Sequence, residues 1–489
     1  MSADVPENIF LNYIKNKQIG SFQTGLLLMR IGLPIGIFGA LMLMPTPNGL
    51  TEEGQRALAI MVLAVVLWST EALHIAVTGL ISLVLLVLFQ GVADIGGALH
   101  GFSQPVCYFL LGILTLGLAV HNSGLAERMA ISLIRMSGGS PKRLYFQMLV
   151  SFAVLTFALP SASTRGAILV HVYEQVLESW GVDKSDRLYK ALMIAMASLN
   201  RLGSTALLAG GITPVVAAAL IVQYGNINDF SWTGWFILMA LPFYVMLLVG
   251  GFLVFIIYNS GFKQRNDALV PNLVNNPISK QEIRVSIILI GTALLWFTDS
   301  FHGLPPAVPA LIAMVVILMP KVGLLDWRYF EQNLGWTNFF VIATSLSLAN
   351  ALVTSGAAGW FAELLVGSVK GLEDSPLSVL LVMSVSAAIA RLLMPNIAAY
   401  LALVIPIAMS TAAVMGMNPI ICGLAVVIVG DSVVFYPAGG TASVFIYIRA
   451  EIRSPEVFRL GIIMTLVSIA TVFCVALPYW NMLGQNLTS

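Results

Sequence analysis

The chain has 489 residues; 58% are hydrophobic, only 10% are charged, and the formal net charge is +1. A soluble globular protein has about 25% charged residues, so this composition excludes a soluble protein, and the near-neutral charge indicates no nucleic-acid partner. Long apolar runs recur along the chain, each sufficient to cross about 30 Å of hydrocarbon. They lack the alternation of membrane β-strands. We therefore expect an all-α polytopic membrane protein that is surrounded by the lipid bilayer.

The apolar runs predict segments, in chain order, at 24–44, 56–71, 74–93, 104–123, 144–178, 190–224, 233–258, 284–300, 303–320, 335–353, 376–415, 417–448 and 459–480. Two of them, 144–178 and 376–415, carry polar residues near the middle and predict re-entrant hairpins. With a cytoplasmic N-terminus, Arg56 and Lys370 are then the only basic residues on outer stretches, as the positive-inside rule favours. The pattern predicts about 11 transmembrane helices in the inner, or plasma, membrane and a C-terminus outside.

Short motifs recur in the same order along the two halves of the chain. The pairs are WSTEALH at 68–74 with WFTDSFH at 296–302, NSGLA at 122–126 with TSGAA at 354–358, PSASTRGAILVHV at 160–172 with PNIAAYLALVIPI at 395–407, and AGG at 209–211 with AGG at 438–440. Each half contains an odd number of crossings, so the two copies have opposite topology. Inverted repeats of this kind are typical of secondary transporters.

This duplication divides the chain into four parts. We expect an N-terminal cytoplasmic segment with the first helix (1–50), a first repeat with a cytoplasm-facing hairpin (51–259), a cytoplasmic linker (260–283), and a second repeat with an outward-facing hairpin (284–482).

Several isolated reactive side chains favour structural roles. His74, His302, Glu71 and Asp299 lie between apolar runs, where a turn or helix-interface role is favoured over transport chemistry. Three cysteines lie within apolar segments, at Cys107, Cys422 and Cys474. We expect small core residues at these positions, with neither a disulfide nor a metal site.

Polar residues interrupt the apolar segments at 160–165, 200–211, 395–396 and 431–441. Within hydrocarbon, a broken backbone is tolerated only where it is buried in protein or lines a wet cavity, and ionisable residues at that depth are functional candidates. Helix N-termini, hydroxyls and arginine forks suit carboxylate or sulfate groups, and glycines let a ligand approach the backbone. The same small and hydroxyl residues also mediate ordinary helix packing.

The predicted site has two groups of residues. The substrate-binding candidates are Ser161, Ala162, Ser163, Thr164, Arg165, Asn200, Arg201, Ser204, Thr205, Gly210, Gly211, Asn396, Gly439, Gly440 and Thr441. The coupling-ion or charge-pair candidates are Ser161, Gly203, Arg391, Asn396, Asp431 and Ser432. Within these sets Arg165 is the preferred anion contact, Arg391 either snorkels or caps the start of its hairpin helix, and Asp431 either pairs with an arginine or helps to bind a cation. Arg30 lies outside the repeats and is expected to snorkel.

Two stretches resemble one known family. GLTEEGQRALAIMVLAVVLWSTEAL at 49–73 is similar to the opening motif of the divalent anion:sodium symporters, and LGILTLGLAVHNSGLAERMA at 111–130 resembles their fourth helix and the surface helix after it. These carriers transport dicarboxylates, citrate or sulfate. The resemblance implies a homodimer, a fixed scaffold domain, a transport domain that moves like an elevator, no cofactor, and Na⁺ as the coupling ion.

The hairpin tips depart from that family. Its members carry a Ser-Asn-Thr triplet at each tip, whereas the first tip here reads Ser161-Ala162-Ser163 and the second reads Asn396-Ile397-Ala398. The later breaks keep their glycines but lose the family's prolines and asparagine. We expect arginines beside the breaks to take over the charge balance of sodium, which would favour anion exchange or proton coupling.

The sequence therefore predicts a secondary active transporter for a small organic or inorganic anion, di- or tricarboxylate or sulfate-like, working as a sodium symporter or an anion exchanger. One alternative is a cation/proton antiporter of the same broad superfamily, which would need paired membrane acids where the sequence offers Asp431 alone. An intramembrane enzyme would need a catalytic cluster, and the histidines are scattered singly. A channel is disfavoured by the two opposed hairpins.

Overall fold

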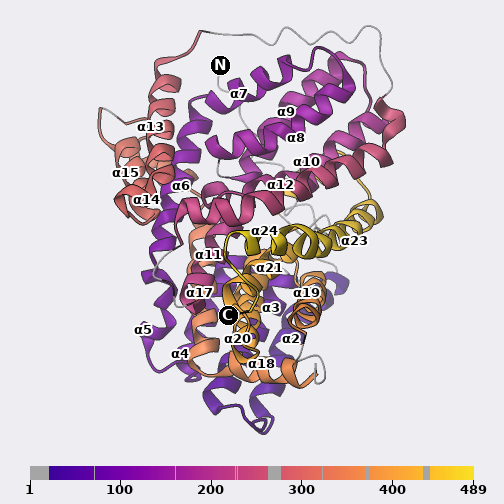
Figure 1. The fold of residues 1–489 in the computed structure, drawn as a ribbon. Helices are drawn as coiled ribbons and strands as arrows, with labels where there is room; N and C mark the ends of the chain where they lie inside the picture. Colours follow the sequence, from indigo (N-terminus) through magenta and orange to yellow (C-terminus); the bar gives the residue numbers. More distant parts are fainter. Residues whose placement is uncertain are drawn as a thin grey trace.

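The computed structural model describes residues 21–70, 72–159, 161–225, 227, 230–262, 277–321, 323–368, 375–432, 435 and 441–488. The regular secondary structure of these residues is helical, which confirms the all-α class (Figure 1). Glu71, Gly439 and Gly440 lie outside the described residues.

The first half of the chain forms α2 (Ser21–Leu43), α3 (Glu52–Thr70), α4 (Ile75–Leu88), α5 (Ile95–Ala98), α6 (Pro105–Asn122), α7 (Leu125–Arg135), α8 (Pro141–Ala158), α9 (Ala162–Ser179), α10 (Arg187–Thr205), α11 (Ile212–Gly225) and α12 (Trp232–Ile257). Short 3₁₀ turns lie at η1 (His100–Ser103), η2 (Leu208–Gly210) and η3 (Asn259–Phe262).

The second half forms α13 (Lys280–Phe297), α14 (Asp299–His302), α15 (Ala307–Leu318), α16 (Trp327–Asn333), α17 (Trp336–Thr354), α18 (Ala357–Ser368), α19 (Pro376–Leu393), α20 (Ile397–Val414), α21 (Pro419–Asp431), α22 (Thr441–Arg449), α23 (Ser454–Thr471) and α24 (Leu477–Met482). A π-helical turn, η5 (Val472–Ala476), joins the last two.

The helices of the two halves follow one another in a similar order. From α6 to α12 and from α17 to α23, each helix of one series has a counterpart in the other. The short helices α7 and α18 hold matching places in the two series and lie at opposite ends of the molecule in Figure 1. These matches support the predicted duplication.

Six helical stretches of the described residues are long and apolar enough to cross a membrane. They are 105–122, 232–257, 336–354, 376–393, 397–414 and 454–482. The predicted segments 190–224 and 417–448 are each divided into two helices, α10 with α11 and α21 with α22, so the chain is interrupted where polar residues and glycines predicted it. The number of crossings stays a prediction.

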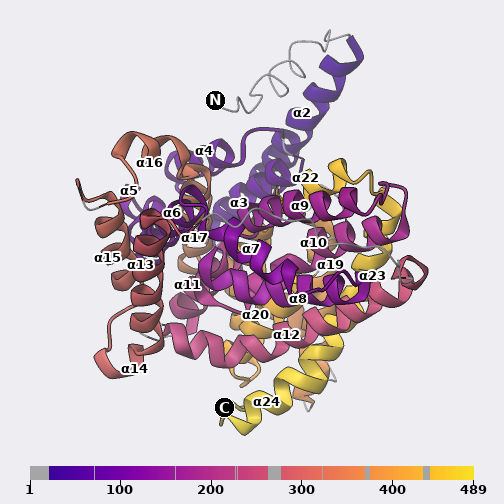
Figure 2. The ribbon, with the colours of Figure 1, turned by 90° about the horizontal axis from the view of Figure 1, so that it is seen from above.

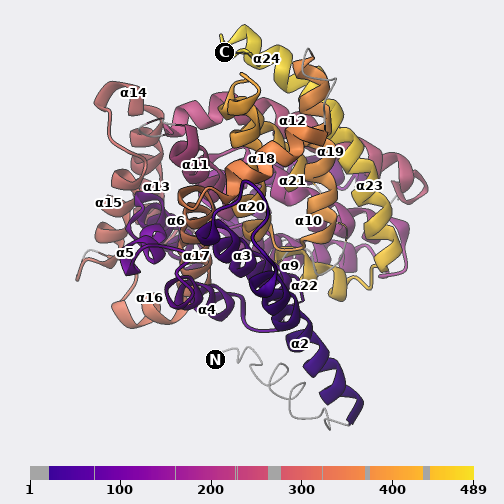
Figure 3. The same cartoon turned by 90° about the horizontal axis from the view of Figure 1, so that it is seen from below.

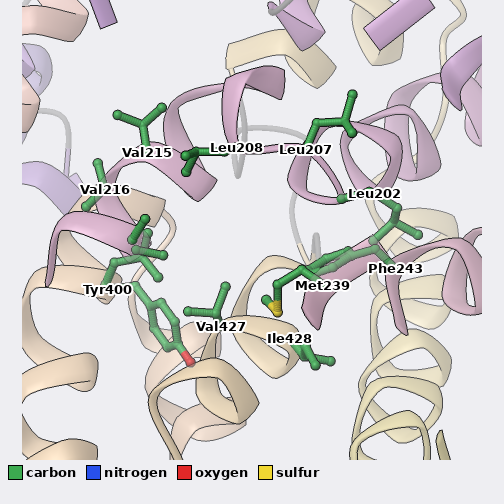
Figure 4. Packing of buried hydrophobic residues seen from close by; sticks show 14 of the residues in the cluster. Leu202, Leu207, Leu208, Val215, Val216, Met239, Phe243, Tyr400, Val427 and Ile428 are labelled. Atoms are coloured by element: carbon green, nitrogen blue, oxygen red, sulfur yellow. The ribbon is translucent and has the colours of Figure 1, made fainter. Parts of the chain in front are cut away.

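Helix α10 runs through the interior of the bundle, whereas α2, α13 and α15 lie at its periphery (Figures 2 and 3). Gly203 lets α10 approach α8, because a Cβ atom at this position would lie 2.8 Å from the carbonyl oxygen of Phe152. Apolar side chains of both halves gather around the break that follows α10 (Figure 4). They include Leu207, Leu208, Val215, Val216, Tyr400, Val427 and Ile428. The chain break is therefore enclosed by protein.

The two hairpins, α8–α9 and α19–α20, turn through similar backbone conformations. Leu159 ends α8 at φ −123° and ψ 92°, and Met394 ends α19 at φ −117° and ψ 89°. Ser161 and Asn396 then act as the N-caps of the returning helices. Both turns match the predicted tips.

The non-helical breaks are shorter than expected. Arg165 already belongs to the first turn of α9, with its N–H bonded to the carbonyl of Ser161 at 2.9 Å, so the expectation that it lies inside the break is wrong. Residues 200–205 are likewise helical, and the chain leaves α10 only at Ala206. For α9 the reason is local capping: the hydroxyl of Ser161 accepts from the N–H of Thr164 and starts the helix early.

The structural roles expected for isolated residues are found at His302 and Asp299. His302 lies 2.8 Å from the carbonyl of Leu295 and accepts from the N–H of Leu304, so it stabilises a turn. Asp299 accepts from the N–H of Thr233 at 3.0 Å. Two cysteines are buried, at Cys107 and Cys422, whereas Cys474 is exposed on the surface of the bundle, and the expectation of a core position there is wrong.

Candidate functional site

An ion pair joins the two halves of the chain at the ends of α10 and α21. The guanidinium of Arg201 donates to the carboxylate of Asp431, a residue 230 positions later. Asp431 is fully buried and also accepts from the hydroxyls of Thr205 and Thr213, the latter at 3.2 Å. The Arg201 side chain remains 14% exposed, and Asp431 is its one hydrogen-bond acceptor among the described residues. Arg201 therefore keeps donors that a ligand can use.

Arg165 has a different environment, because it is fully buried between α9 and α10. Its Nε donates to Oδ1 of Asn200 at 2.6 Å, and its Nη atoms donate to the carbonyls of Leu159 (2.8 Å) and Asn200 (3.0 Å) and to the hydroxyl of Ser204 (2.5 Å). The amide of Asn200 in turn donates to the carbonyl of Ala162 at 2.9 Å. These bonds hold the first hairpin tip against α10.

The hydroxyls of the first tip have separate functions. Ser161 caps α9, and its Oγ accepts from both the N–H and the hydroxyl of Thr164, at 3.2 and 3.0 Å. Ser163 is exposed at the same turn. Of the three hydroxyls, that of Ser163 is thus the one open to a ligand.

The second hairpin has its own buried arginine. Arg391, in the last turn of α19, donates to the carbonyl oxygens of Gly430 (3.0 Å), Pro395 (2.8 Å) and Met394. It is 2% exposed, so it does not snorkel. Asn396 caps α20 by accepting from two backbone N–H groups, at 3.0 and 3.1 Å. The arginine closes the C-terminal end of α19, whereas the cap expected from it was at the start of the hairpin helix.

The break after α10 requires a glycine at one position. A Cβ atom on Gly210 would lie 1.9 Å from the carbonyl oxygen of Ser204, so only glycine fits there. Gly211 is half-buried in an extended conformation, and Ser432 is buried with its hydroxyl bonded to the carbonyl of Val429. Thr441 begins α22, and its side chain is not described.

The structure thus brings together most of the predicted site, in two clusters. One contains the first tip with Asn200 and Ser204, and the other contains Arg201, Thr205 and Asp431. Within the described residues no group of three or more His, Cys, Asp or Glu side chains could hold a metal ion.

Two residues near the site were not predicted from the sequence. Thr213 contacts Asp431 from the start of α11, and its position directly after the AGG motif was the available signal. Gly430 lies against the ring of Tyr400, where a Cβ atom would meet Cε1 at 2.0 Å. That contact joins α20 to α21 and had no sequence signal, because it depends on tertiary packing.

A buried polar centre beside two helical hairpins, in a bundle with six helical stretches long and apolar enough to cross a membrane in the described residues, is typical of an integral membrane transporter. Residues 26–486 match the family described as the sodium:sulfate symporter transmembrane region. The chain belongs to this family, and the predicted resemblance is confirmed. Its relatives are transporters, not enzymes.

Named relatives cover much of the chain. The L-tartrate/succinate antiporter of Escherichia coli (strain K12) is 23% identical over 89% of this chain and 94% of its own length. The chloroplastic dicarboxylate transporter 1 of Arabidopsis thaliana is 25% identical over 67% of this chain and 60% of its own length. The crystal structure of the YdaH transporter of Alcanivorax borkumensis shares the fold, with a TM-score of 0.54 at 15% identity over 95% of this chain and 98% of that chain.

Proposed function

We propose that this protein is a secondary active transporter that exchanges small dicarboxylate-like anions across the inner membrane. The observation that carries the proposal is the excess of positive charge at the centre of the bundle. Arg165, Arg201 and Arg391 lie at or near the hairpin tips, and Asp431, which pairs with Arg201, is the buried acid of this group in the described residues. A fixed excess of buried positive charge favours an anion over a cation as the ligand.

Arg201 is the proposed contact for the substrate carboxylate. Its guanidinium is partly exposed and keeps free donors, whereas Arg165 donates to backbone, amide and hydroxyl oxygens and Arg391 donates to backbone carbonyls. Ser163 and the N-terminus of α9, in whose first turn it lies, are the proposed partners for a second anionic group. The other hydroxyls and glycines of the predicted site then act in capping and packing.

Exchange is preferred to sodium symport because of the helix ends in the hairpins. In secondary transporters, coupling cations bind at unwound carbonyls and at the C-terminal ends of half-helices. In this chain Arg165 donates to the carbonyl that follows α8, and Arg391 donates to the two carbonyls that follow α19. A guanidinium at each end supplies the charge that Na⁺ would otherwise bring. The name of the tartrate/succinate antiporter relative agrees with exchange.

Transport into proteoliposomes tests this proposal. Labelled succinate uptake should require unlabelled dicarboxylate inside the vesicles and should be equal in sodium and choline buffers. Uptake into empty vesicles that follows an inward sodium gradient would instead establish a symporter, and a proton flux without anion movement would favour a cation/proton antiporter. Arg201→Gln should abolish exchange, whereas the matched change Arg30→Gln, at an exposed arginine on α2, should leave it intact.

The homodimer, the elevator movement, the inverted topology and the cytoplasmic N-terminus remain part of the proposal. They rest on the family resemblance, on the order of the helices and on the distribution of basic residues. Labelling of single cysteines placed on α7 or α18 with a membrane-impermeant thiol reagent, in a chain whose three native cysteines are replaced, would test whether the two ends of the molecule are accessible from opposite sides of the membrane.

A further inference from the structure

A cavity lies away from the hairpin tips, where the N-terminal ends of α10 and α23 meet the C-terminal end of α12. It has a volume of about 550 Å³. Four basic residues line it, namely Arg187, Lys190, Arg453 and Arg459, together with one acid, Glu456. The cavity is thus strongly basic in a chain whose formal net charge is only +1.

Most of this positive charge is not neutralised by the protein. Glu456 pairs with Arg453 at 3.0 Å. Arg187 donates to the hydroxyl of Ser260 at 2.7 Å. In the described part of the chain, no acid forms an ion pair with Arg187, Lys190 or Arg459. Three cations that share one cavity repel one another unless an anion binds between them.

Apart from Ser185 and Tyr258, the remainder of the cavity wall is aliphatic. The apolar lining residues are Ile194, Val254, Ile257, Leu460 and Ile463. Two of the three helices, α12 and α23, belong to stretches long and apolar enough to span a membrane. Ile256, Ile462 and Leu466 beside the cavity are 54%, 45% and 65% exposed, so the wall continues onto a surface suited to lipid chains. A small hydrophilic anion would gain nothing from this wall.

We propose that this cavity binds the phosphate headgroup of an anionic phospholipid, with the basic residues around the phosphate and the acyl chains along the aliphatic wall. Basic pockets between membrane helices bind anionic headgroups in this way. A bound lipid would bridge α10, α12 and α23 at one membrane surface. Because α10 also carries Arg201 at its other end, the lipid would fix the helix that holds the ion pair with Asp431.

The test uses the full chain purified in a neutral detergent, with the thermal unfolding midpoint followed as lipid is added. Phosphatidylglycerol should raise the midpoint, whereas phosphatidylcholine with the same acyl chains and soluble glycerol phosphate should not. The variant Lys190→Gln/Arg459→Gln should raise the half-saturating concentration of phosphatidylglycerol by roughly 30-fold, since each basic residue at a lipid surface contributes about fivefold to the affinity.

The control variant is Lys142→Gln/Arg143→Gln, which removes two exposed charges from the first turn of α8 and should leave the response unchanged. Equal responses to the two lipids, an equal loss in both variants, or the same response to glycerol phosphate would overturn the lipid site; the last outcome would indicate a free phosphate site. If the cavity variant fails to fold, native mass spectrometry of the unaltered protein decides, because preferential retention of phosphatidylglycerol supports the proposal and equal retention of phosphatidylcholine refutes it.

Discussion

Loss of the Arg201 guanidinium should destabilise the protein through the carboxylate that it leaves behind. Asp431 is 0% exposed, so in Arg201→Met its charge would keep only the hydroxyls of Thr205 and Thr213 as partners. Breaking a buried pair in this way costs about 3–5 kcal/mol. Asp431→Asn should cost less, about 1–2 kcal/mol, because the amide oxygen can still accept and the remaining guanidinium is 14% exposed to solvent.

The double variant gives the decisive comparison. Arg201→Met/Asp431→Asn contains neither charge, so we expect it to be more stable than Arg201→Met alone, with a coupling energy of about 2–3 kcal/mol. Chemical unfolding of the purified variants in detergent measures this, and Arg30→Met, at an exposed arginine, should change the free energy of unfolding by less than about 0.5 kcal/mol. Costs that simply add, or a double variant less stable than Arg201→Met, would refute the buried ion pair.

The stability rescue also separates structure from function. The double variant should recover its fold without recovering anion affinity, because the proposed substrate contact is the guanidinium itself. Titration with succinate, followed by the unfolding midpoint, should therefore show binding to the unaltered protein and none to either variant that lacks Arg201. Binding by the double variant would place the anion contact elsewhere.

Three further predictions concern positions outside that pair. Gly101→Ala should destabilise the protein by several kcal/mol, because the new Cβ atom would lie 1.9 Å from a carbonyl oxygen of α17. Gly359→Ala in α18, where a Cβ atom would have no neighbour within 4 Å, should stabilise it by about 0.5–1 kcal/mol. Unfolding midpoints that shift in the same direction in the two variants would contradict this. Asn396→Ala should cost about 1 kcal/mol and Asn396→Ser much less, since a hydroxyl also caps a helix; equal losses in an unfolding assay would argue against the cap. Glu282 precedes the predicted span 284–300, and hydrogen bonds from Arg128 lower the pKa of its carboxyl from 4.5 to about 2. The pair should therefore stabilise the protein fully above pH 4.5 and lose this effect as the pH falls toward 2. If the free energy of unfolding depends on pH in the same way in the unaltered protein and in Arg128→Gln, this prediction is wrong.

The positions of the hairpins could be predicted from the sequence because their signals are local. A polar residue or proline within an apolar run stops a helix whatever its neighbours are, and Ser161 and Asn396 were found in this way. The role of each arginine could not be predicted, because it depends on distant partners. Arg165 binds oxygens 35 and 39 positions later, and Arg201 binds a carboxylate 230 positions later.

The same reasoning explains why the helices extend further than expected. Polar residues at 200–205 indicated a break, but in α10 their side chains bond to α9 and to Asp431 while the backbone stays helical. A polar side chain inside an apolar segment therefore indicates either a broken backbone or a buried hydrogen-bond partner, and the sequence signal is the same in both cases. Gly203 stays within the helix, so the presence of glycine alone does not mark a break; the chain leaves α10 at Ala206 and reaches Gly210, where a side chain cannot fit.

On the proposed exchange mechanism, the fixed arginines hinder the return of the empty carrier across the membrane. A bound Na⁺ can leave the carrier, but Arg165, Arg201 and Arg391 cannot, so an empty carrier keeps an excess of two positive charges over Asp431 in the described centre. Moving that charge through a low-dielectric region is costly. A dianion cancels it, whereas a monoanion leaves one charge and a trianion overshoots. The loaded carrier should therefore move more readily than the empty one, which makes exchange obligatory and selects dianions such as dicarboxylates. A monocarboxylate of similar shape should neither enter nor drive the release of labelled succinate.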